Sequence, residues 1–452
     1  MSKRRIVWVV IAVVVVLALV LAAITWARAA HRPSSDVTPS PTPSSSIAPV
    51  PTPEPAPTPT MPTPEWGASP SWQTALSGSG IDWFSAVAAA PDGGIYAVGT
   101  TESNDQDFAG SSATSDHPDA VVAKFTATGQ RVWVKTFGGT TNDGFDGVAI
   151  AADGGIVVCG YTDSTDGNLI TESNAGTNDA LVAKISADGD LIWATTVGGD
   201  WAGSLSSVTL AADGSIYAAG SGMSDANGGA GVATKVTADG KVVWTKTYGT
   251  WGVEFNSVIA DPAGGVMAAG STSSTQGSLP KSSDSGFEAG DGLMVKLAGD
   301  GTMSWHKTFP GTSDTTIYAA ALTPDGNFIA TAGDLIVRTD TKGKVLSQNP
   351  IAPVSATAYG VTGLAALPNG LIVMAIVSYG VGVPDASNTS ASVVALRNDT
   401  ELQFMTSVNN GVHASLNSVA ATADGTTVVA VGTLTGSGTY DSDAFIVAFQ
   451  IG

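Results

Sequence analysis

Short apolar runs, separated by glycine-containing turns, recur from residue 67 to the end of the chain. In FSAVAAAPDGGIYAVG, which starts at Phe84, two such runs flank an Asp-Gly pair. These turn residues tolerate positive φ and are typical of β-hairpins, and helical spacing is absent. Equivalent turns occur at Asp92, Asp153, Asp213, Ala263, Asp325, Asn369 and Asp424. The pattern predicts an all-β domain of seven similar units.

A second strand pair completes each unit, as in DALVAKISADGDLIWATTVGG from Asp179. In the first unit we expect strands at residues 85–90, 94–101, 119–126 and 130–137. The repeating tryptophans have a period of about 50–60 residues, which is typical of propeller blades. They are Trp133, Trp193, Trp244 and Trp305. Seven units of four strands predict a seven-bladed β-propeller.

The seventh unit lacks a fourth strand of its own. SWQTAL, at residues 71–76, precedes the first unit and places Trp72 where the other units have their tryptophan. Pairing of this segment with residues 443–450 would close the ring and remove an open sheet edge. We therefore expect the amino-terminal strand to complete the last blade.

The amino terminus predicts where the domain resides. Residues 1–5 form a short basic segment. Residues 6–26 form an uninterrupted apolar segment that is long enough to span a bilayer as one helix. The positive-inside rule keeps residues 1–5 cytoplasmic. We expect an uncleaved anchor in the cell membrane with the propeller outside. A secretory signal peptide is the alternative, because Ala27-Arg28-Ala29 resembles a cleavage site.

Residues 27–66 contain 12 of the chain's 23 prolines together with many serines and threonines. This composition favours an extended stalk on the order of 100 Å. The domain that follows, residues 67–452, is acidic, since the chain has a formal charge of -20 and a pI near 4.3. Acidity argues against nucleic acid as a partner. The single cysteine, Cys159, excludes an intrachain disulfide. We also expect the propeller to be monomeric.

DALVAKISADGDLIWATTVGG and GFDGVAIAADGGIVVCGYTDST resemble the bacterial secreted propeller repeats of the SBBP or delta-60 type. Their turn-and-tryptophan portion is similar to the blade motif of quinoprotein-like propellers. The resemblance implies architecture and a cell-surface location, and little chemistry. Quinoprotein dehydrogenases bind pyrroloquinoline quinone and calcium in larger propellers, often beside a vicinal disulfide. Seven units and one cysteine predict no cofactor here, and the tryptophans, with Trp72, should dock adjacent blades.

Sequence motifs for catalysis are absent. The chain has no nucleophile elbow, zinc helix or P-loop, and its propeller histidines, His117, His306 and His413, fall in three different units. A pair of carboxylates across the channel needs no local motif and would support glycosidase chemistry. An extracellular glycoside hydrolase or lyase therefore stays open as the alternative to a non-catalytic binding module.

Ligand binding is expected on one face of the propeller, where the long connections lie. Trp201 and Trp251 occupy equivalent positions in neighbouring loops, with Trp83 near the same place in the first unit. These side chains would stack on a glycan, anchor a surface protein or simply cap the loops. Acids gather on this face too, at Asp105, Asp107, Asp116, Asp143, Asp163 and Asp166. We include Asp143 among the ligand-binding candidates and expect solvated loop charge rather than a metal site, although calcium is a possible ligand.

Overall fold

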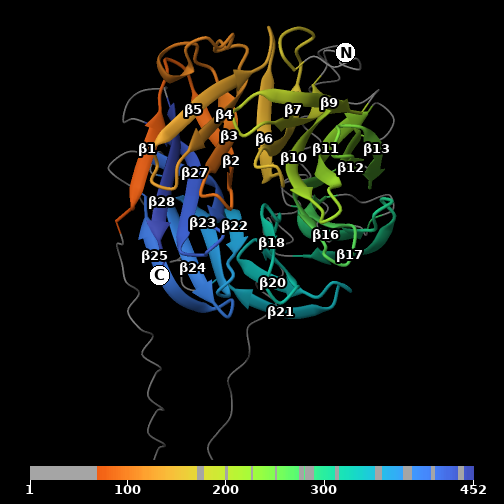
Figure 1. Ribbon diagram of the computed structural model, residues 1–452. Coiled ribbons are helices and arrows are strands. Elements are labelled where there is room, and N and C mark those ends of the chain that lie inside the picture. The colour runs from red at the N-terminus through yellow and green to blue at the C-terminus, as the bar shows by residue number, and fades with distance from the viewer. Residues whose placement is uncertain are drawn as a thin grey trace, which may run out of the picture. The chain divides into compact units, whose positions relative to one another are not determined.

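Seven four-stranded antiparallel sheets are arranged in a ring, as a computed structural model shows (Figure 1). The structure describes residues 69–169, 178–198, 202–224, 228–249, 252–273, 279, 290–310, 315–351, 359–379, 389–408, 413–435 and 442–451. The predicted seven-bladed β-propeller is confirmed. Within each blade the strands are called A to D from the channel outward.

Blades 1 to 4 follow the repeat closely. Their strands are β2 (Asp82–Ala89), β3 (Ile95–Thr101), β4 (Asp119–Phe125) and β5 (Arg131–Phe137); β6 (Asp143–Ile150), β7 (Ile156–Thr162), β8 (Asp179–Ile185) and β9 (Leu191–Val197); β10 (Ala202–Leu210), β11 (Ile216–Ser224), β12 (Gly228–Val236) and β13 (Val242–Tyr248); β14 (Val253–Ala260), β15 (Val266–Thr272), β16 (Asp291–Leu297) and β17 (Met303–Phe309). A 3-10 turn, η1 (Gln106–Phe108), lies in the first B–C loop.

Blades 5 to 7 are more degenerate in sequence but keep the same strand order. Their strands are β18 (Ala320–Leu322), β19 (Phe328–Ala332), β20 (Leu335–Thr339) and β21 (Val345–Pro350); β22 (Tyr359–Ala366), β23 (Leu371–Tyr379), β24 (Thr389–Arg397) and β25 (Glu401–Ser407); β26 (His413–Ala421), β27 (Thr427–Thr435) and β28 (Ser442–Gln450). Strand A of blade 5 is the shortest, with three residues.

The predicted ring closure is confirmed. β1 (Trp72–Leu76) pairs antiparallel with β28, with Trp72 opposite Ala448 and Leu76 opposite Ala444. Figure 1 shows the two strands side by side, although they come from opposite ends of the domain. Strand A of blade 1 begins earlier than predicted, at Asp82, because residues 82–84 continue the ladder opposite β3.

The core is divided among the junctions between blades. In the described residues the buried apolar side chains form seven clusters, and each cluster combines side chains from two neighbouring blades. The cluster between blades 7 and 1, for example, contains Leu76 and Ile446 with Phe84 and Phe125. Since each blade contributes to two clusters, hydrophobic burial holds the ring together around its whole circumference.

Five of the D strands carry a tryptophan that reaches the C–D turn of the next blade. Each indole N–H donates to a backbone carbonyl there: Trp72 to Ala127, Trp133 to Ala187, Trp193 to Ala238, Trp244 to Gly299 and Trp305 to Thr341. The turn needs glycine at this contact. Gly129, for example, has φ +80, and a Cβ on it would lie 2.4 Å from the Trp72 ring.

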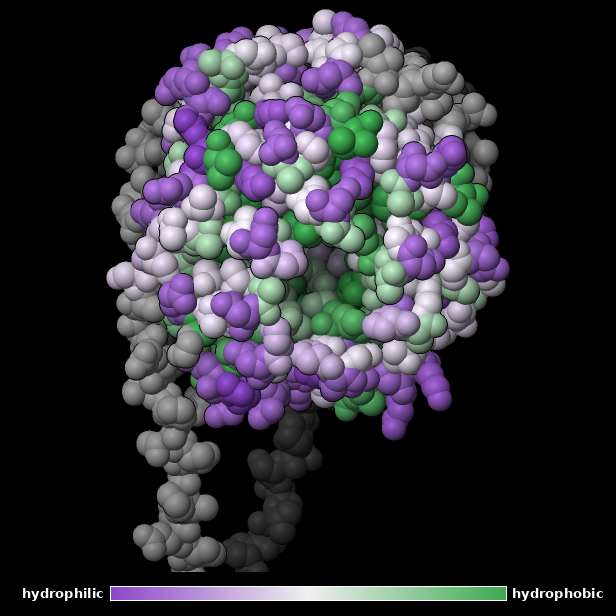
Figure 2. Space-filling view, in the orientation of Figure 1, coloured by the Kyte–Doolittle hydropathy of each residue, from purple (hydrophilic) through white to green (hydrophobic). Residues whose placement is uncertain are grey.

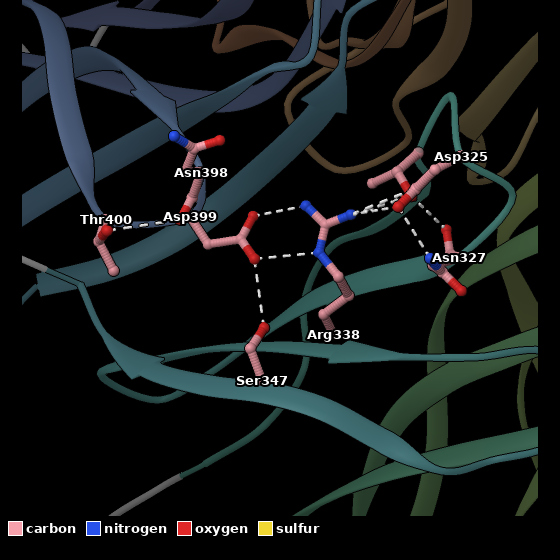
Figure 3. Close-up of polar contacts among 8 residues, drawn as sticks. Asp325, Asn327, Arg338, Ser347, Asn398, Asp399 and Thr400 are labelled. Atoms are coloured by element: carbon pink, nitrogen blue, oxygen red, sulfur yellow. Dashed lines mark hydrogen bonds and ion pairs between the residues drawn. The ribbon is translucent and has the colours of Figure 1, made fainter.

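Blade 5 has Ser347 at the tryptophan position and contacts blade 6 differently. The Arg338 guanidinium donates to Asp399 from Nε at 3.0 Å and from Nη2 at 2.6 Å. Ser347 Oγ donates to the same carboxylate at 3.2 Å, and Asp325 flanks Arg338 on its other side (Figure 3). An ion pair between blades thus stands where five other junctions have a tryptophan. At the sixth, between blades 6 and 7, Phe404 takes the tryptophan position and its ring lies against that of Phe449.

Among the residues that the structure describes, no helix is long and apolar enough to cross a membrane. The predicted spanning segment at residues 6–26 and the stalk at residues 27–66 fall outside those residues.

Candidate functional site

The inner strands carry an extra residue at the same height in six blades. Strand pairing shifts by one position between strands A and B, and a β-bulge of this kind re-aims a side chain. The residues skipped in the register are Ser85, Asp146, Ser206, Asn256, Thr362 and Asn417. Tyr318 lies at the aligned position in blade 5. These seven residues, the channel ring, line a central cavity of about 180 Å³.

Several members of the channel ring connect neighbouring blades. Asn256 Nδ2 donates to the carbonyl of Ile317 at 3.2 Å, and Asn417 Nδ2 donates to the carbonyl of Phe84 at 2.9 Å. The Thr362 hydroxyl donates to the carbonyl of Leu416 in the same way. In each case the acceptor is the backbone oxygen of the residue that precedes the next blade's member of the channel ring. The ring therefore has a structural role in part of its circumference.

Asp146 is the one carboxyl group in the channel ring. Its Oδ2 accepts a hydrogen bond from Ser204 Oγ of blade 3 at 2.9 Å. Burial raises the pKa of Asp146 to about 6, and the Ser204 hydrogen bond only partly opposes that shift. Asp146 belongs to none of the ion pairs within the described ranges. An uncompensated carboxyl that faces a cavity is a candidate for ligand contact.

The enzyme alternative requires two carboxyls that converge in the channel. Asp146 is the only acid among the described residues that line the central cavity. The lining is otherwise neutral and combines small polar side chains with Ala, Gly and Val. This composition can hydrogen-bond a hydroxyl-rich ligand but lacks the second carboxyl that glycosidase chemistry uses.

Trp83 lies on β2, half-buried and opposite Thr100. It stands two residues before Ser85 on the same strand, nearer the long-loop face, and it is not among the residues that line the central cavity. Glu254 is the exposed equivalent in blade 4. Trp201 and Trp251, the other predicted stacking residues, lie outside the described residues.

A second hollow lies at the A–B turns of blades 1 to 3. Its volume is about 620 Å³, and apolar residues such as Ile150, Leu210 and Pro91 form most of its wall. Figure 2 shows the molecule hollowed near the centre of the viewed side, where apolar residues line the depression. The volume is within the usual range of small-molecule pockets, but few polar groups converge on it to orient a ligand.

Acids of the long loops mostly bind backbone N–H groups. Asp107 Oδ2 accepts from the Ser77 N–H at 3.0 Å, and Asp105 Oδ1 accepts from the Ser79 N–H at 2.9 Å. Asp166 accepts from the Thr140 N–H at 2.8 Å. These acids tie B–C loops to D–A loops, a role that the sequence analysis missed. Within the described ranges no three His, Cys, Asp or Glu side chains gather closely enough to hold a metal ion.

Asp143, a predicted ligand-binding residue, is fully buried beneath these loops. Its Oδ2 accepts from Ser164 Oγ at 2.7 Å and from the Gly139 N–H at 3.0 Å. Burial raises the pKa of Asp143, whereas the hydroxyls of Thr162 and Ser164 lower it. The same arrangement recurs in blade 1, where Thr101 and Ser103 donate to Asp82. In both blades the donors belong to a Thr-x-Ser sequence at the end of strand B, Thr101 to Ser103 and Thr162 to Ser164. This repeated sequence could have predicted the buried hydrogen bonds.

No protein-family model and no curated protein sequence matches this chain. Among solved structures, the WD40 domain of Neurospora crassa Pan2 shares 10% identity over 84% of this chain and 96% of that one, with a TM-score of 0.46. A Bacteroides caccae protein of unknown function shares 13% identity over 64% of this chain and 95% of that one, with a TM-score of 0.40. Puromycin hydrolase shares 15% identity over 81% of this chain and 53% of its own, with a TM-score of 0.48. Such distant likenesses concern the fold alone. The SBBP or delta-60 type and a bacterial origin stay predictions.

Proposed function

We propose that this chain is a cell-surface binding module, a non-catalytic propeller that recognises a glycan. The observation that carries the proposal is the channel ring, with its neutral hydrogen-bonding side chains and a single carboxyl, Asp146, around one cavity. Ser, Asn and Thr side chains suit the hydroxyls of a sugar, and an aromatic face suits its apolar side. Trp83 supplies that face one step nearer the long loops.

The location follows from the amino-terminal composition. The apolar segment at residues 6–26 would anchor the chain as a single pass through the cell membrane, and residues 27–66 would hold the propeller away from the bilayer. The propeller then acts outside the cell as a monomer. Its acidity leaves nucleic acid out of the set of partners. A surface protein is the second class of ligand that the same loops would suit.

A glycan array with the full chain in detergent micelles tests the proposal. Trp83→Ala and Asp146→Asn should each reduce glycan binding at least tenfold. Ile192→Ala is the matched control, because Ile192 is 57% exposed on the outer strand β9, far from the channel ring. Thermal unfolding of each variant separates lost binding from lost folding. Absence of binding by the wild-type chain to any glycan, or equal loss in the control, refutes the assignment.

A further inference from the structure

The channel ring consists of an arc that joins blades and an arc that does not. Its members from blades 4, 6 and 7 each donate a hydrogen bond to a backbone carbonyl of the next blade. Ser85 and Ser206, in blades 1 and 3, make no side-chain hydrogen bond to another blade within the described residues. Asp146 lies between them in blade 2, and an ionised carboxylate has no hydrogen to donate. The polar groups of blades 1 to 3 are therefore available to a ligand in the channel.

Asp146 presents one carboxylate oxygen to the channel. Ser204 Oγ donates to Oδ2 at 2.9 Å, whereas Oδ1 accepts no hydrogen bond within the described ranges. Oδ1 is also not sealed from solvent, and Asp146 lines the central cavity. The surrounding protein nevertheless desolvates the carboxyl, so that burial raises the pKa of Asp146 to about 6. A positive group on a ligand would stabilise the ionised form and offset the cost of burial.

The described part of the protein supplies no positive charge to Asp146. Asp146 belongs to none of the ion pairs there, and the cavity lining contains no Lys, Arg or His. Two other titratable groups sense its charge, Cys159 and Tyr161. Burial first, and the charge of Asp146 in addition, raise the pKa of both groups, so both are neutral at neutral pH. A cationic ligand would provide the counter-charge that these residues lack.

The aromatic member of the channel ring lies across the channel from this carboxylate. Tyr318 belongs to blade 5, three blades from Asp146, which is the greatest separation in a ring of seven. Its side chain is 48% exposed, but the backbone before it is fixed. Asn256 Nδ2 donates to the carbonyl of Ile317 at 3.2 Å, and the Ile317 N–H donates to the carbonyl of Gly270 at 3.1 Å. An anchored aromatic ring of this kind offers a face on which a sugar can stack.

We propose that the channel recognises a terminal amino sugar, whose free ammonium group pairs with Asp146 and whose ring packs against Tyr318. This inference rests on the proposed function and names the class of glycan. The cavity volume of about 180 Å³ is below the roughly 300–1,000 Å³ of drug-sized pockets, so it suits a single sugar unit. Hydroxyls of the same unit would bond to Ser85 and Ser206. Carboxylated, sulfated and phosphorylated sugars would be repelled by Asp146.

Calorimetric titration of the full chain in detergent micelles with three matched tetrasaccharides tests the proposal. The β-linked tetramers of glucosamine, N-acetylglucosamine and glucose share one linkage and differ in a single substituent. The wild-type chain should bind the glucosamine tetramer at least about tenfold more tightly than the other two, because only its amino group carries a charge. Asp146→Asn should abolish this preference. Tyr318→Ala should weaken binding of all three tetramers, whereas Tyr318→Phe, which keeps the aromatic ring, should bind them as the wild type does.

A charge control separates a specific ion pair from the general acidity of the chain. Glu401→Gln removes an exposed carboxylate from the outer strand β25 and should leave the preference unchanged. Since the preference is a ratio measured on one protein sample, a smaller folded fraction in a variant does not alter it. The design therefore reports on the contact with Asp146 even if Asp146→Asn changes stability.

Three outcomes overturn the proposal. If the wild type binds the N-acetylglucosamine or glucose tetramer as tightly as the glucosamine tetramer, the amino-sugar inference fails while the glycan-binding function stands. A preference that persists in Asp146→Asn, or that Glu401→Gln abolishes equally, also refutes the assigned ion pair and leaves glycan binding intact. If the wild type binds none of the tetramers, the amino-sugar inference fails, and the glycan array decides separately on the proposed function.

Discussion

The contact between blades 5 and 6 permits a quantitative test of how the ring is joined where the tryptophan is missing. Asp399 lies in the C–D turn of blade 6 with φ 65, and 7% of its side chain is exposed. Arg338, its partner on β20, is 18% exposed in its side chain. Replacement of Asp399 by Asn removes the charge. It keeps an oxygen for Ser347 and a residue that tolerates the left-handed backbone conformation.

The expected cost follows from the burial of the pair. Breaking a fully buried ion pair costs about 3–5 kcal/mol, whereas an exposed pair is worth about 0–1 kcal/mol. Arg338 and Asp399 lie between these limits, so Asp399→Asn should lower the free energy of unfolding by about 2 kcal/mol. Asp399→Ala should cost about 1 kcal/mol more, because alanine adds left-handed strain and loses the Ser347 hydrogen bond.

Urea unfolding of the full chain, followed by tryptophan fluorescence, measures these changes. A double-mutant cycle with Arg338→Met isolates the pair: Arg338→Met should cost much less when Asp399 is already Asn. Asp239→Asn is the control, since Asp239 pairs with Lys241 on the exposed surface of the blade 3 C–D turn, and no measurable change is expected. Equal stability of Asp399→Asn and wild type, or strict additivity in the cycle, would refute the reasoning.

Three further predictions concern the channel, the closure and the blade contacts. Asp146→Asn should stabilise the chain above pH 6 by up to about 3 kcal/mol and have no effect below pH 4, as urea midpoints at pH 4 and 7.5 would reveal. The sign follows because the folded pKa is about 6 against an ordinary value of 3.8, so the wild type loses stability as pH rises through this window. Leu76→Ala, in the closing strand, should cost about 3 kcal/mol by urea unfolding, because Leu76 is 1% exposed. Gly129→Ala should lower the Tm measurably by calorimetry, because the new Cβ would meet the Trp72 ring at 2.4 Å.

The fold was predictable because each blade repeats the same local signals. Asp-Gly and Gly-Gly turns mark the hairpins, and the tryptophan period marks the blades, so errors in one unit are corrected by its neighbours. The closure was predictable for the same reason, since SWQTAL supplies the one tryptophan-bearing strand that unit seven lacks. The degenerate fifth unit was harder, and the replacement of its tryptophan contact by Arg338 and Asp399 left no local signal.

The channel ring was not predicted, because a β-bulge is a property of strand register rather than of composition. Ser85 and Asp146 stand at one position in their units, but periodicity alone does not show that the position is the unpaired one. Asp143 was expected on the ligand-binding face, whereas the structure buries it beneath the long loops. Long-loop acids such as Asp107 were expected to be solvated, whereas the structure uses them to hold backbone N–H groups.

Asp146 is the one acidic residue at a channel-ring position that is neutral in the other six blades. Such a departure from the repeat indicates a role other than holding the fold together. At the channel ring six blades carry neutral side chains, and three of these donate to a carbonyl of the next blade. Asp146 cannot make that contact as an acceptor, and Cys159 donates to the carbonyl of Leu205 at that junction instead. A serine or asparagine at residue 146 would avoid the cost of burying a carboxyl. Burial raises the pKa of Asp146, and its carboxyl adds no ion pair within the described residues. This is why the proposed function assigns ligand contact in the channel to Asp146.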